Sequence, residues 1–153
     1  MSLLKFSVSG KSANATKFVA KSRQFEIVID EPPALGGADE AANPVEYLLA
    51  SYAGCLNVVG HIVAAEQKLD LKGLEIAIEG EIDPARLFGQ KTEARAGYQG
   101  LEVKLIPDTD ASQERLALWL AEVEKRCPIN DNLSSQTPVE ISVETQPLVV
   151  KAA

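Results

Sequence analysis

Two cysteines, Cys55 and Cys127, are the residues whose types could do chemistry in this chain. A cysteine thiolate is a nucleophile, and a pair of neighbouring thiols can cycle between a dithiol and a disulfide. The two positions are 72 residues apart, so any approach would be made by the tertiary structure. Two cysteines and one histidine, without CxxC or HxxxH spacing, do not match a zinc site. No metal and no cofactor is therefore predicted.

Each cysteine falls on an apolar stripe of a predicted helix. Asn43-Pro44 is a helix-start signal, and the first helix is predicted over residues 44–69. A helical wheel places five residues on one of its faces: Leu48, Tyr52, Cys55, Val59 and Ile62. A second helix, predicted over residues 110–127, repeats that spacing with Leu116, Leu120, Val123 and Cys127. The thiols can approach if the stripes pack on each other. They could also be inert core residues, because free cysteine packs as a small hydrophobe.

Helix position activates neither cysteine. Cys55 lies mid-helix, and Cys127 lies at a helix C-terminus, where the dipole opposes a thiolate. A reactive Cys55 would need a nearby cation, preferably an arginine that stays charged when buried. The candidates are Arg23, Arg86, Arg95, Arg115 and Arg126, and composition does not choose among them.

The surrounding elements predict an α+β fold in one domain over residues 1–153. Alternating or β-branched segments predict strands at residues 3–9, 16–20, 24–29, 74–82, 101–106 and 139–144. Residues 30–43 are rich in proline, glycine and acidic side chains and predict an ordered loop, whereas residues 83–99 are irregular. The resulting order is βββ-α-ββ-α-β.

Composition narrows the possible partners. The chain has 153 residues, is 46% hydrophobic and carries a net charge of −7, with its basic residues scattered. Nucleic acid and anionic membranes are therefore not expected as partners.

The apolar tract over residues 45–63 is interrupted by Glu46, Asn57 and His61, so no membrane span is predicted. The N-terminus has no signal-peptide pattern, so the expected location is the cytoplasm. The first helix is apolar on almost every side, which predicts deep burial or a partner chain.

Several segments, in order along the chain, resemble those of a known family. They are DEPPALGG at residues 30–37, NPVEYLLA at 43–50 followed by AGC at 53–55, RAGYQ at 95–99, CPI at 127–129 with Asn132-Leu133, and TPV at 137–139. Together they resemble the OsmC/Ohr family of thiol-dependent peroxidases over about residues 20–145.

The resemblance implies a fold and an activity. The fold would be OsmC-like, with antiparallel sheets around two central helices, in an intertwined homodimer with active sites at the interface. Cys55 would be the peroxidatic cysteine that reduces an organic hydroperoxide, and Cys127 would resolve the sulfenic acid as a disulfide. An external dithiol, often a lipoyl group in relatives, would restore both thiols. We expect Leu48, Tyr52, Leu56 and Val59 to line an apolar cleft for the substrate.

The sequence departs from the family pattern at two charged positions. Ohr-type members carry a glutamate directly after the helix-start proline, whereas here Val45 follows it and Glu46 comes one position later. Glu46 precedes Cys55 by nine residues and points to the opposite side of the helix, so it could serve only across a dimer interface or as a helix-start charge. The family's loop arginine is missing between residues 10 and 21, which leaves Arg23 and Arg95 as candidates.

Two other functions remain open at this point. One is a non-enzymatic dimer that binds a small apolar ligand. The other is a slow thiol redox sensor.

Overall fold

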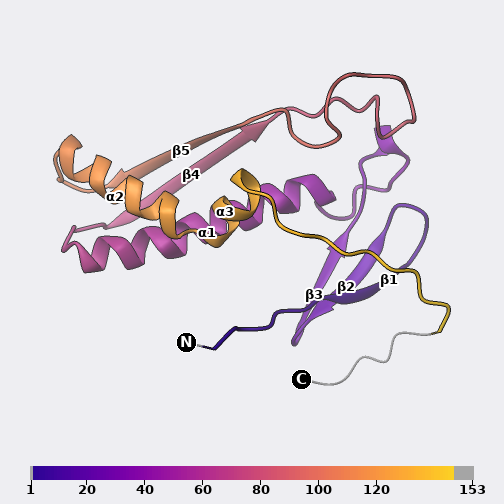
Figure 1. Ribbon diagram of the computed structural model, residues 1–153, viewed down its shortest axis with the longest axis horizontal. Helices are drawn as coiled ribbons and strands as arrows, with labels where there is room; N and C mark the ends of the chain where they lie inside the picture. The colour runs from indigo at the N-terminus through magenta and orange to yellow at the C-terminus, as the bar shows by residue number, and fades with distance from the viewer. Residues whose placement is uncertain (1, 147–153) are drawn as a thin grey trace. The chain divides into compact units, whose positions relative to one another are not determined.

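A computed structural model describes residues 2–146, and these residues form two compact units. The first contains residues up to 48 together with those from 138 onward, and the second contains residues 49–137. Figure 1 shows the elements of both units, which are described separately below.

The first unit is built on a three-stranded antiparallel sheet in the order β1-β2-β3. The strands are β1 (Ser9–Ser12), β2 (Phe18–Ser22) and β3 (Phe25–Ile29). Ser22 pairs with Phe25 across a two-residue connection, in which Arg23 adopts a positive φ of 55°. The predicted small antiparallel unit is confirmed, with its first strand displaced along the chain.

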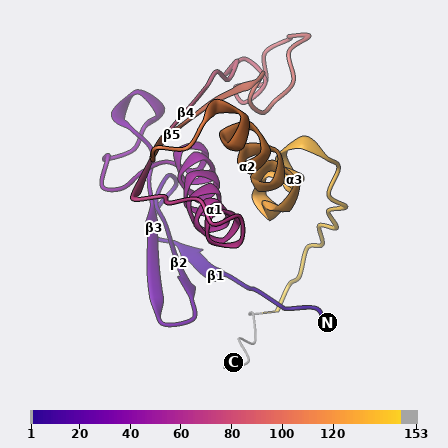
Figure 2. The ribbon, with the colours of Figure 1, turned by 90° about the vertical axis from the view of Figure 1, so that its left-hand side faces the viewer.

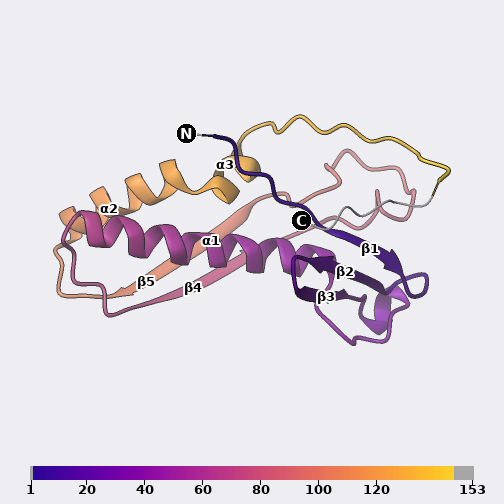
Figure 3. The ribbon, with the colours of Figure 1, turned by 90° about the horizontal axis from the view of Figure 1, so that it is seen from below.

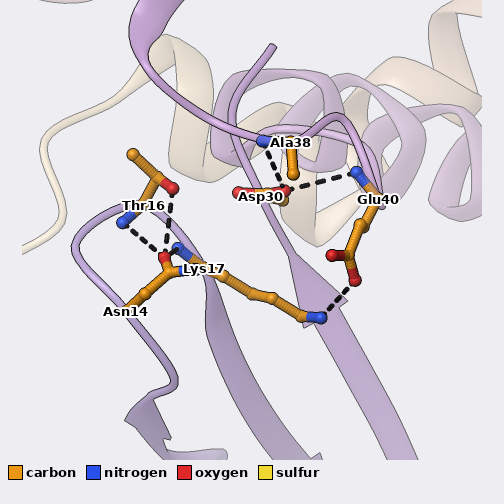
Figure 4. A network of polar contacts seen from close by, with 6 residues as sticks. All are labelled: Asn14, Thr16, Lys17, Asp30, Ala38 and Glu40. Carbon is orange, nitrogen blue, oxygen red and sulfur yellow. Dashed lines mark hydrogen bonds and ion pairs between the residues drawn. The ribbon is translucent and has the colours of Figure 1, made fainter. Parts of the chain in front are cut away.

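A buried carboxylate fixes the loop that follows β3. The side chain of Asp30 is fully buried, and its Oδ2 accepts hydrogen bonds from the N–H groups of Ala38 (3.1 Å) and Glu40 (3.3 Å), as Figure 4 shows. Glu40 also pairs with Lys17. Burial raises the pKa of Asp30, but backbone hydrogen bonds, including those from Glu40 and Ala38, outweigh it and bring the pKa below its ordinary value. The loop contains a 3₁₀ turn, η1 (Pro33–Leu35), and is ordered as the sequence predicts.

Helix α1 (Pro44–Glu66) begins with a reciprocal capping box. The N–H of Glu46 donates to Asn43 Oδ1 (2.9 Å), and the N–H of Asn43 donates to Glu46 Oε2 (2.8 Å). This arrangement satisfies two backbone donors that the first turn would otherwise leave free. The predicted helix start is confirmed.

The same helix ends three residues before the predicted position, in a Schellman motif. Lys68 adopts φ 52°, its N–H donates to Ala65 O (3.2 Å), and the N–H of Leu69 donates to Ala64 O (2.8 Å). The Arg115 guanidinium covers the carbonyls of Gln67 (3.0 Å) and Lys68 (3.1 Å). The residue in the left-handed region at this helix end is usually glycine, whereas here it is Lys68. The end of α1 could therefore not be located from the sequence.

The second unit packs helices against a two-stranded antiparallel ribbon. The ribbon consists of β4 (Gly73–Gly80) and β5 (Leu101–Asp108), and the helices are α1 from residue 49 onward, α2 (Gln113–Arg126) and α3 (Pro128–Ser134). Figures 1 and 3 show α1 and α2 running alongside each other and along the ribbon. Figure 2 looks along α1, with α2 and α3 beside it. The core of this unit is formed by Tyr52, Leu56, Val59, Val63, Ala64, Leu69, Trp119, Val123 and Cys127.

A single buried hydrogen bond fixes the spacing of α1 and α2. Trp119 is 2% exposed, and its Nε1–H donates to the carbonyl of Gly60 (2.9 Å). A Cβ atom at Gly60 would lie 3.1 Å from the Trp119 ring, so glycine permits this close approach. Trp119 and Tyr52 are both buried in the core of the second unit.

By length and composition alone, α1 could cross a membrane. A single such helix is weak support for a span, since a core helix in a soluble protein passes the same test. Leu56 and Val63 of α1 belong to the core of the second unit.

Two predicted strands are wrong for this chain. Residues 3–8 and 139–144 form no strand, and their apolar side chains are exposed, for instance Phe6 at 86% and Ile141 at 88%. Alternation indicates a half-buried strand but does not provide the neighbouring strand that a ladder requires. Among the described residues, neither segment pairs with a strand of this chain.

The predicted helix boundaries and stripes also need correction. The buried face of α1 centres on Leu56 and Val63, whereas Leu48 and Ile62, expected on the same stripe as Cys55, are partly exposed. Helix α2 begins after Ser112, whose side chain accepts from the N–H of Arg115, rather than at Asp110. A helical wheel assumes ideal helix geometry. It does not show which face of a helix packs against the β4–β5 ribbon.

Candidate thiol site

The second unit brings the two cysteines into contact. The Sγ atoms of Cys55 and Cys127 lie 3.0 Å apart, although both are free thiols. Cys127 is fully buried, whereas Cys55 is partly exposed. The two thiols therefore do approach each other, as the sequence allowed, and of the two cysteines only Cys55 has surface exposed to solvent.

Cys127 occupies the junction of two helices. Its N–H donates to Val123 O (3.0 Å) and closes α2, and its Sγ accepts from the N–H of Asn130 (3.4 Å) as the N-cap of α3. Pro128 lies just beyond the end of α2 and also opens α3, a helix that was not predicted from the sequence. Proline at the first helical position after a possible cap was the available signal. Cys127 therefore lies at the C-terminus of α2, as expected, and also at the N-terminus of α3.

Two further residues organise this junction. The hydroxyl of Tyr52 donates to Asn130 Oδ1 (2.6 Å), and Asn130 Nδ2 donates to the carbonyl of Glu124 (3.0 Å). The backbone N–H of Ile129 is hydrogen-bonded to Cys55. Tyr52 was expected on the apolar stripe of the first helix, whereas nothing in the sequence singled out Asn130, because its partners come from α1 and α2.

Burial raises the pKa of the Cys55 thiol above its ordinary value. Its contact with Cys127 raises the pKa further, and the hydrogen bond from the Ile129 N–H acts in the opposite direction. Within the described residues, the groups responsible for this shift include no cation. Burial likewise raises the pKa of Tyr52, with contributions from Cys127, Glu124 and Cys55.

The arginines of the second unit are mostly engaged elsewhere. Arg86 donates to the carbonyls of Ala94 (3.0 Å) and Thr92 (3.2 Å) within the β4–β5 loop. Arg115 caps the end of α1, and Arg126 pairs with Glu66. The side chain of Arg95 lies beside Gly97 in the same loop as Arg86.

The other two predicted site residues lie in the first unit. Glu46 is held in the capping box with Asn43. The Arg23 guanidinium stacks over the Phe25 ring, 5.0 Å from its centroid.

Of the four residues expected to line an apolar cleft, only Leu48 is exposed. Tyr52, Leu56 and Val59 are core residues rather than the lining of an open cleft. These three side chains pack against other buried side chains of the second unit. The buried face of α1 is therefore wider than the single stripe expected from the helical wheel. Across residues 2–146, no group of three or more histidine, cysteine or acidic side chains could hold a metal ion.

Comparison with solved structures shows the fold. The chain is similar to an OsmC-like protein from Mycoplasma pneumoniae, with a TM-score of 0.74 and 19% identity, covering 86% of this chain and 88% of that one. It is also similar to an organic hydroperoxide resistance protein OsmC from Legionella pneumophila, with a TM-score of 0.62 and 20% identity, covering 87% and 91%. A putative organic hydroperoxide resistance protein from Vibrio cholerae, with captopril in one active site, gives 0.64 and 21%, covering 87% and 86%. Comparison with the curated proteins found no match.

Sequence comparison with family models extends this likeness from the fold to membership. The model described as OsmC-like protein matches residues 37–142, a stretch that includes α1, the β4–β5 ribbon, α2, α3 and both cysteines. The chain therefore belongs to the OsmC-like protein family.

Proposed function

We propose that the protein is a thiol-dependent peroxidase that reduces organic hydroperoxides through Cys55 and Cys127. One observation carries this proposal: a partly exposed thiol lies 3.0 Å from a fully buried one. The exposed sulfur can meet a peroxide, and the buried sulfur is already in place to react with the product. The organic substrate class is suggested by solved neighbours described as organic hydroperoxide resistance proteins.

The reaction has three steps. The Cys55 thiolate attacks the hydroperoxide, the O–O bond breaks, and a Cys55 sulfenic acid forms. The departing alkoxide takes up the proton that the Cys55 thiol had released to solvent and leaves as the alcohol. The Cys127 thiol attacks that sulfur, so the S–S bond forms and the hydroxyl leaves as water with the Cys127 proton. An external dithiol then reduces the disulfide and is itself oxidised. Because Cys127 is buried, the external thiol attacks on the Cys55 side.

The first step requires a thiolate, and burial works against one at Cys55. We therefore propose that a cation reaches Cys55 in the assembled protein. Arg95 and Arg23 are the candidates, with Glu46 positioning the arginine from a second copy of the chain. Arg86, Arg115 and Arg126 are poorer candidates, because each already donates to groups of its own unit.

We also propose that the working form is an intertwined homodimer. The face of α1 opposite the core exposes apolar side chains, including Val58 at 56%. Residues 139, 141 and 143 present an exposed alternating row of valine and isoleucine. A strand-like row of this kind is stabilised by adding it to the edge of a sheet. Light scattering coupled to gel filtration should give twice the chain mass, and Val58→Glu should shift it toward one chain mass.

The peroxidase proposal is tested by the rate at which the reduced protein consumes peroxide. The reduced protein is mixed with cumene hydroperoxide or hydrogen peroxide, and free thiols and mass are followed with time. We expect both thiols to be lost together with a decrease of about two mass units, the signature of one disulfide. Cys55→Ser should abolish the reaction. Oxidation no faster than that of a free thiol would contradict the proposal.

A slow thiol redox sensor is the second candidate, favoured by the raised pKa of Cys55. A sensor would form the same disulfide, but slowly and with poor turnover in the presence of a dithiol. Rapid multiple turnover distinguishes the peroxidase from the sensor. If the disulfide forms neither rapidly nor slowly with peroxide, and Cys55→Ser retains affinity for an apolar ligand, a binding role is favoured instead.

A further inference from the structure

We infer that Tyr52 and Asn130 are positioning residues for disulfide closure: their hydrogen bond holds Cys127 against Cys55 during the second step. The inference rests on the proposed function, because closure is a step of that reaction. It assigns neither residue to the attack on peroxide. The hydroxyl of Tyr52 is directed at Asn130 Oδ1 (2.6 Å) rather than at a sulfur.

Asn130 connects three parts of the site. Its backbone N–H donates to Cys127 Sγ (3.4 Å), its side-chain amide donates to the Glu124 carbonyl in the last turn of α2 (3.0 Å), and its Oδ1 accepts from Tyr52. Tyr52 lies one turn before Cys55 on α1. The network therefore links the helix that carries one sulfur with the junction that carries the other.

Apart from this network, the α3 side of the junction is held by the Ile129 N–H at Cys55 and by partial packing against the core. The seven residues of α3 include no buried residue, although Ile129 and Leu133 pack partly against the core. Tyr52 is largely buried and its hydrogen bond to Asn130 is partly shielded from solvent, which limits replacement of Asn130 by water as an acceptor. Loss of this hydrogen bond should let α3 and Cys127 shift relative to Cys55, while the Trp119–Gly60 hydrogen bond still fixes the spacing of α1 and α2.

The chemistry makes such a displacement measurable. Closure needs the Cys127 sulfur in line with the S–O bond of the Cys55 sulfenic acid, and rates of this kind depend strongly on alignment. A sulfenic acid that waits longer reacts with a second hydroperoxide and becomes a sulfinic acid, with release of a second alcohol. Slower closure therefore appears as more overoxidation at the same peroxide concentration.

The test compares Tyr52→Phe with Tyr47→Phe. Tyr47 is a matched control, because it also donates one hydrogen bond to a carbonyl, that of Val28 (2.8 Å), in the other unit. Quenched-flow mass spectrometry of the reduced full-length protein with cumene hydroperoxide measures sulfenic acid, disulfide and sulfinic acid. For Tyr52→Phe we expect an unchanged rate of attack, closure slower by about five- to tenfold, as loss of one hydrogen bond would give, and proportionally more sulfinic acid. Tyr47→Phe should match the unsubstituted protein.

Two additional measurements keep the inference falsifiable. Asn130→Ala, which also removes the hydrogen bond to the Glu124 carbonyl, should slow closure at least as much. The double variant should be no slower than Asn130→Ala, because the Tyr52–Asn130 hydrogen bond is already lost there. Oxidation by diamide, which adds to Cys55 and is displaced by Cys127, measures closure without peroxide. The unsubstituted protein could fail to react with peroxide while Tyr52→Phe still slows disulfide formation by diamide. That result would contradict the proposed function and support the positioning role. Unchanged closure in both assays, or equal slowing of attack and closure, would overturn the inference.

Discussion

Gly60→Ala should destabilise the second unit by overpacking the contact between α1 and Trp119. The new Cβ would lie 3.1 Å from Trp119 Cζ2 and 3.1 Å from Leu74 Cδ2, closer than ordinary van der Waals contact. The Leu74 side chain can adjust. The Trp119 ring is held by its hydrogen bond to the Gly60 carbonyl and is almost fully buried. The ring or the helix must therefore shift.

The magnitude combines two opposing contributions. Overpacking of a buried contact costs about 1–3 kcal/mol. Replacing glycine by alanine within a helix stabilises by about 1 kcal/mol. We expect a net loss of roughly 0–2 kcal/mol for Gly60→Ala. In a Trp119→Phe background the clashing ring atoms are gone, so only the favourable contribution remains. The coupling between the two substitutions should therefore equal the overpacking cost, about 1–3 kcal/mol.

Urea unfolding followed by far-ultraviolet circular dichroism is the assay, because Trp119 is the only tryptophan and its fluorescence is lost in every variant that carries Trp119→Phe. Several protein concentrations separate changes in folding from changes in association. Gly54→Ala is the matched control on the same helix, since a Cβ there meets nothing within 4 Å. Its effect should be additive with Trp119→Phe. A coupling below about 0.5 kcal/mol between Gly60→Ala and Trp119→Phe would refute this account of how α1 and α2 are spaced.

Three other substitutions probe the remaining parts of the structure. Cys127→Ser should stop the reaction after one turnover, and dimedone should then label the Cys55 sulfenic acid; equal labelling of the unsubstituted protein would contradict the resolving role. Lys68→Gly should stabilise the chain by about 0.5–1 kcal/mol in urea unfolding, because Lys68 holds φ 52° at the end of α1. Asp30→Asn should destabilise the first unit at neutral pH. Because the folded pKa of Asp30 is lowered, its contribution is present above pH 3.8 and is lost as the pH falls through the folded value, so the difference between unfolding midpoints should shrink there. A difference that does not begin to shrink as the pH falls below 3.8 would contradict this assignment.

Local chemistry is what made part of the fold predictable. The start of α1 follows from Asn43-Pro44 and Glu46, whose side chains and backbone satisfy one another within four residues. The β2–β3 hairpin and the β4–β5 ribbon follow from alternating side chains that meet partners of the same kind. These features depend on neighbours in the chain or on a simple period, so a single sequence contains them.

The terminal strands and the helix ends were not accessible in the same way. Residues 3–8 and 139–144 alternate as strands do, yet the described chain offers them no strand to pair with. The stop at Lys68 depends on a left-handed residue that is not glycine, and on Arg115 from α2 to cover the last carbonyls. Each of these outcomes is decided by groups far away in the sequence.

The candidate site divides along the same line. The sequence by itself determined which residues could react: it contains two cysteines, placed on apolar stripes within family-like segments. Only the tertiary structure decided that their sulfurs lie 3.0 Å apart, that one is buried and the other accessible, and that Tyr52 and Asn130 support the junction between them. The physical reason is that a side chain's chemical type is local, whereas its distance to a partner, its exposure and its pKa depend on how helices distant in sequence pack together.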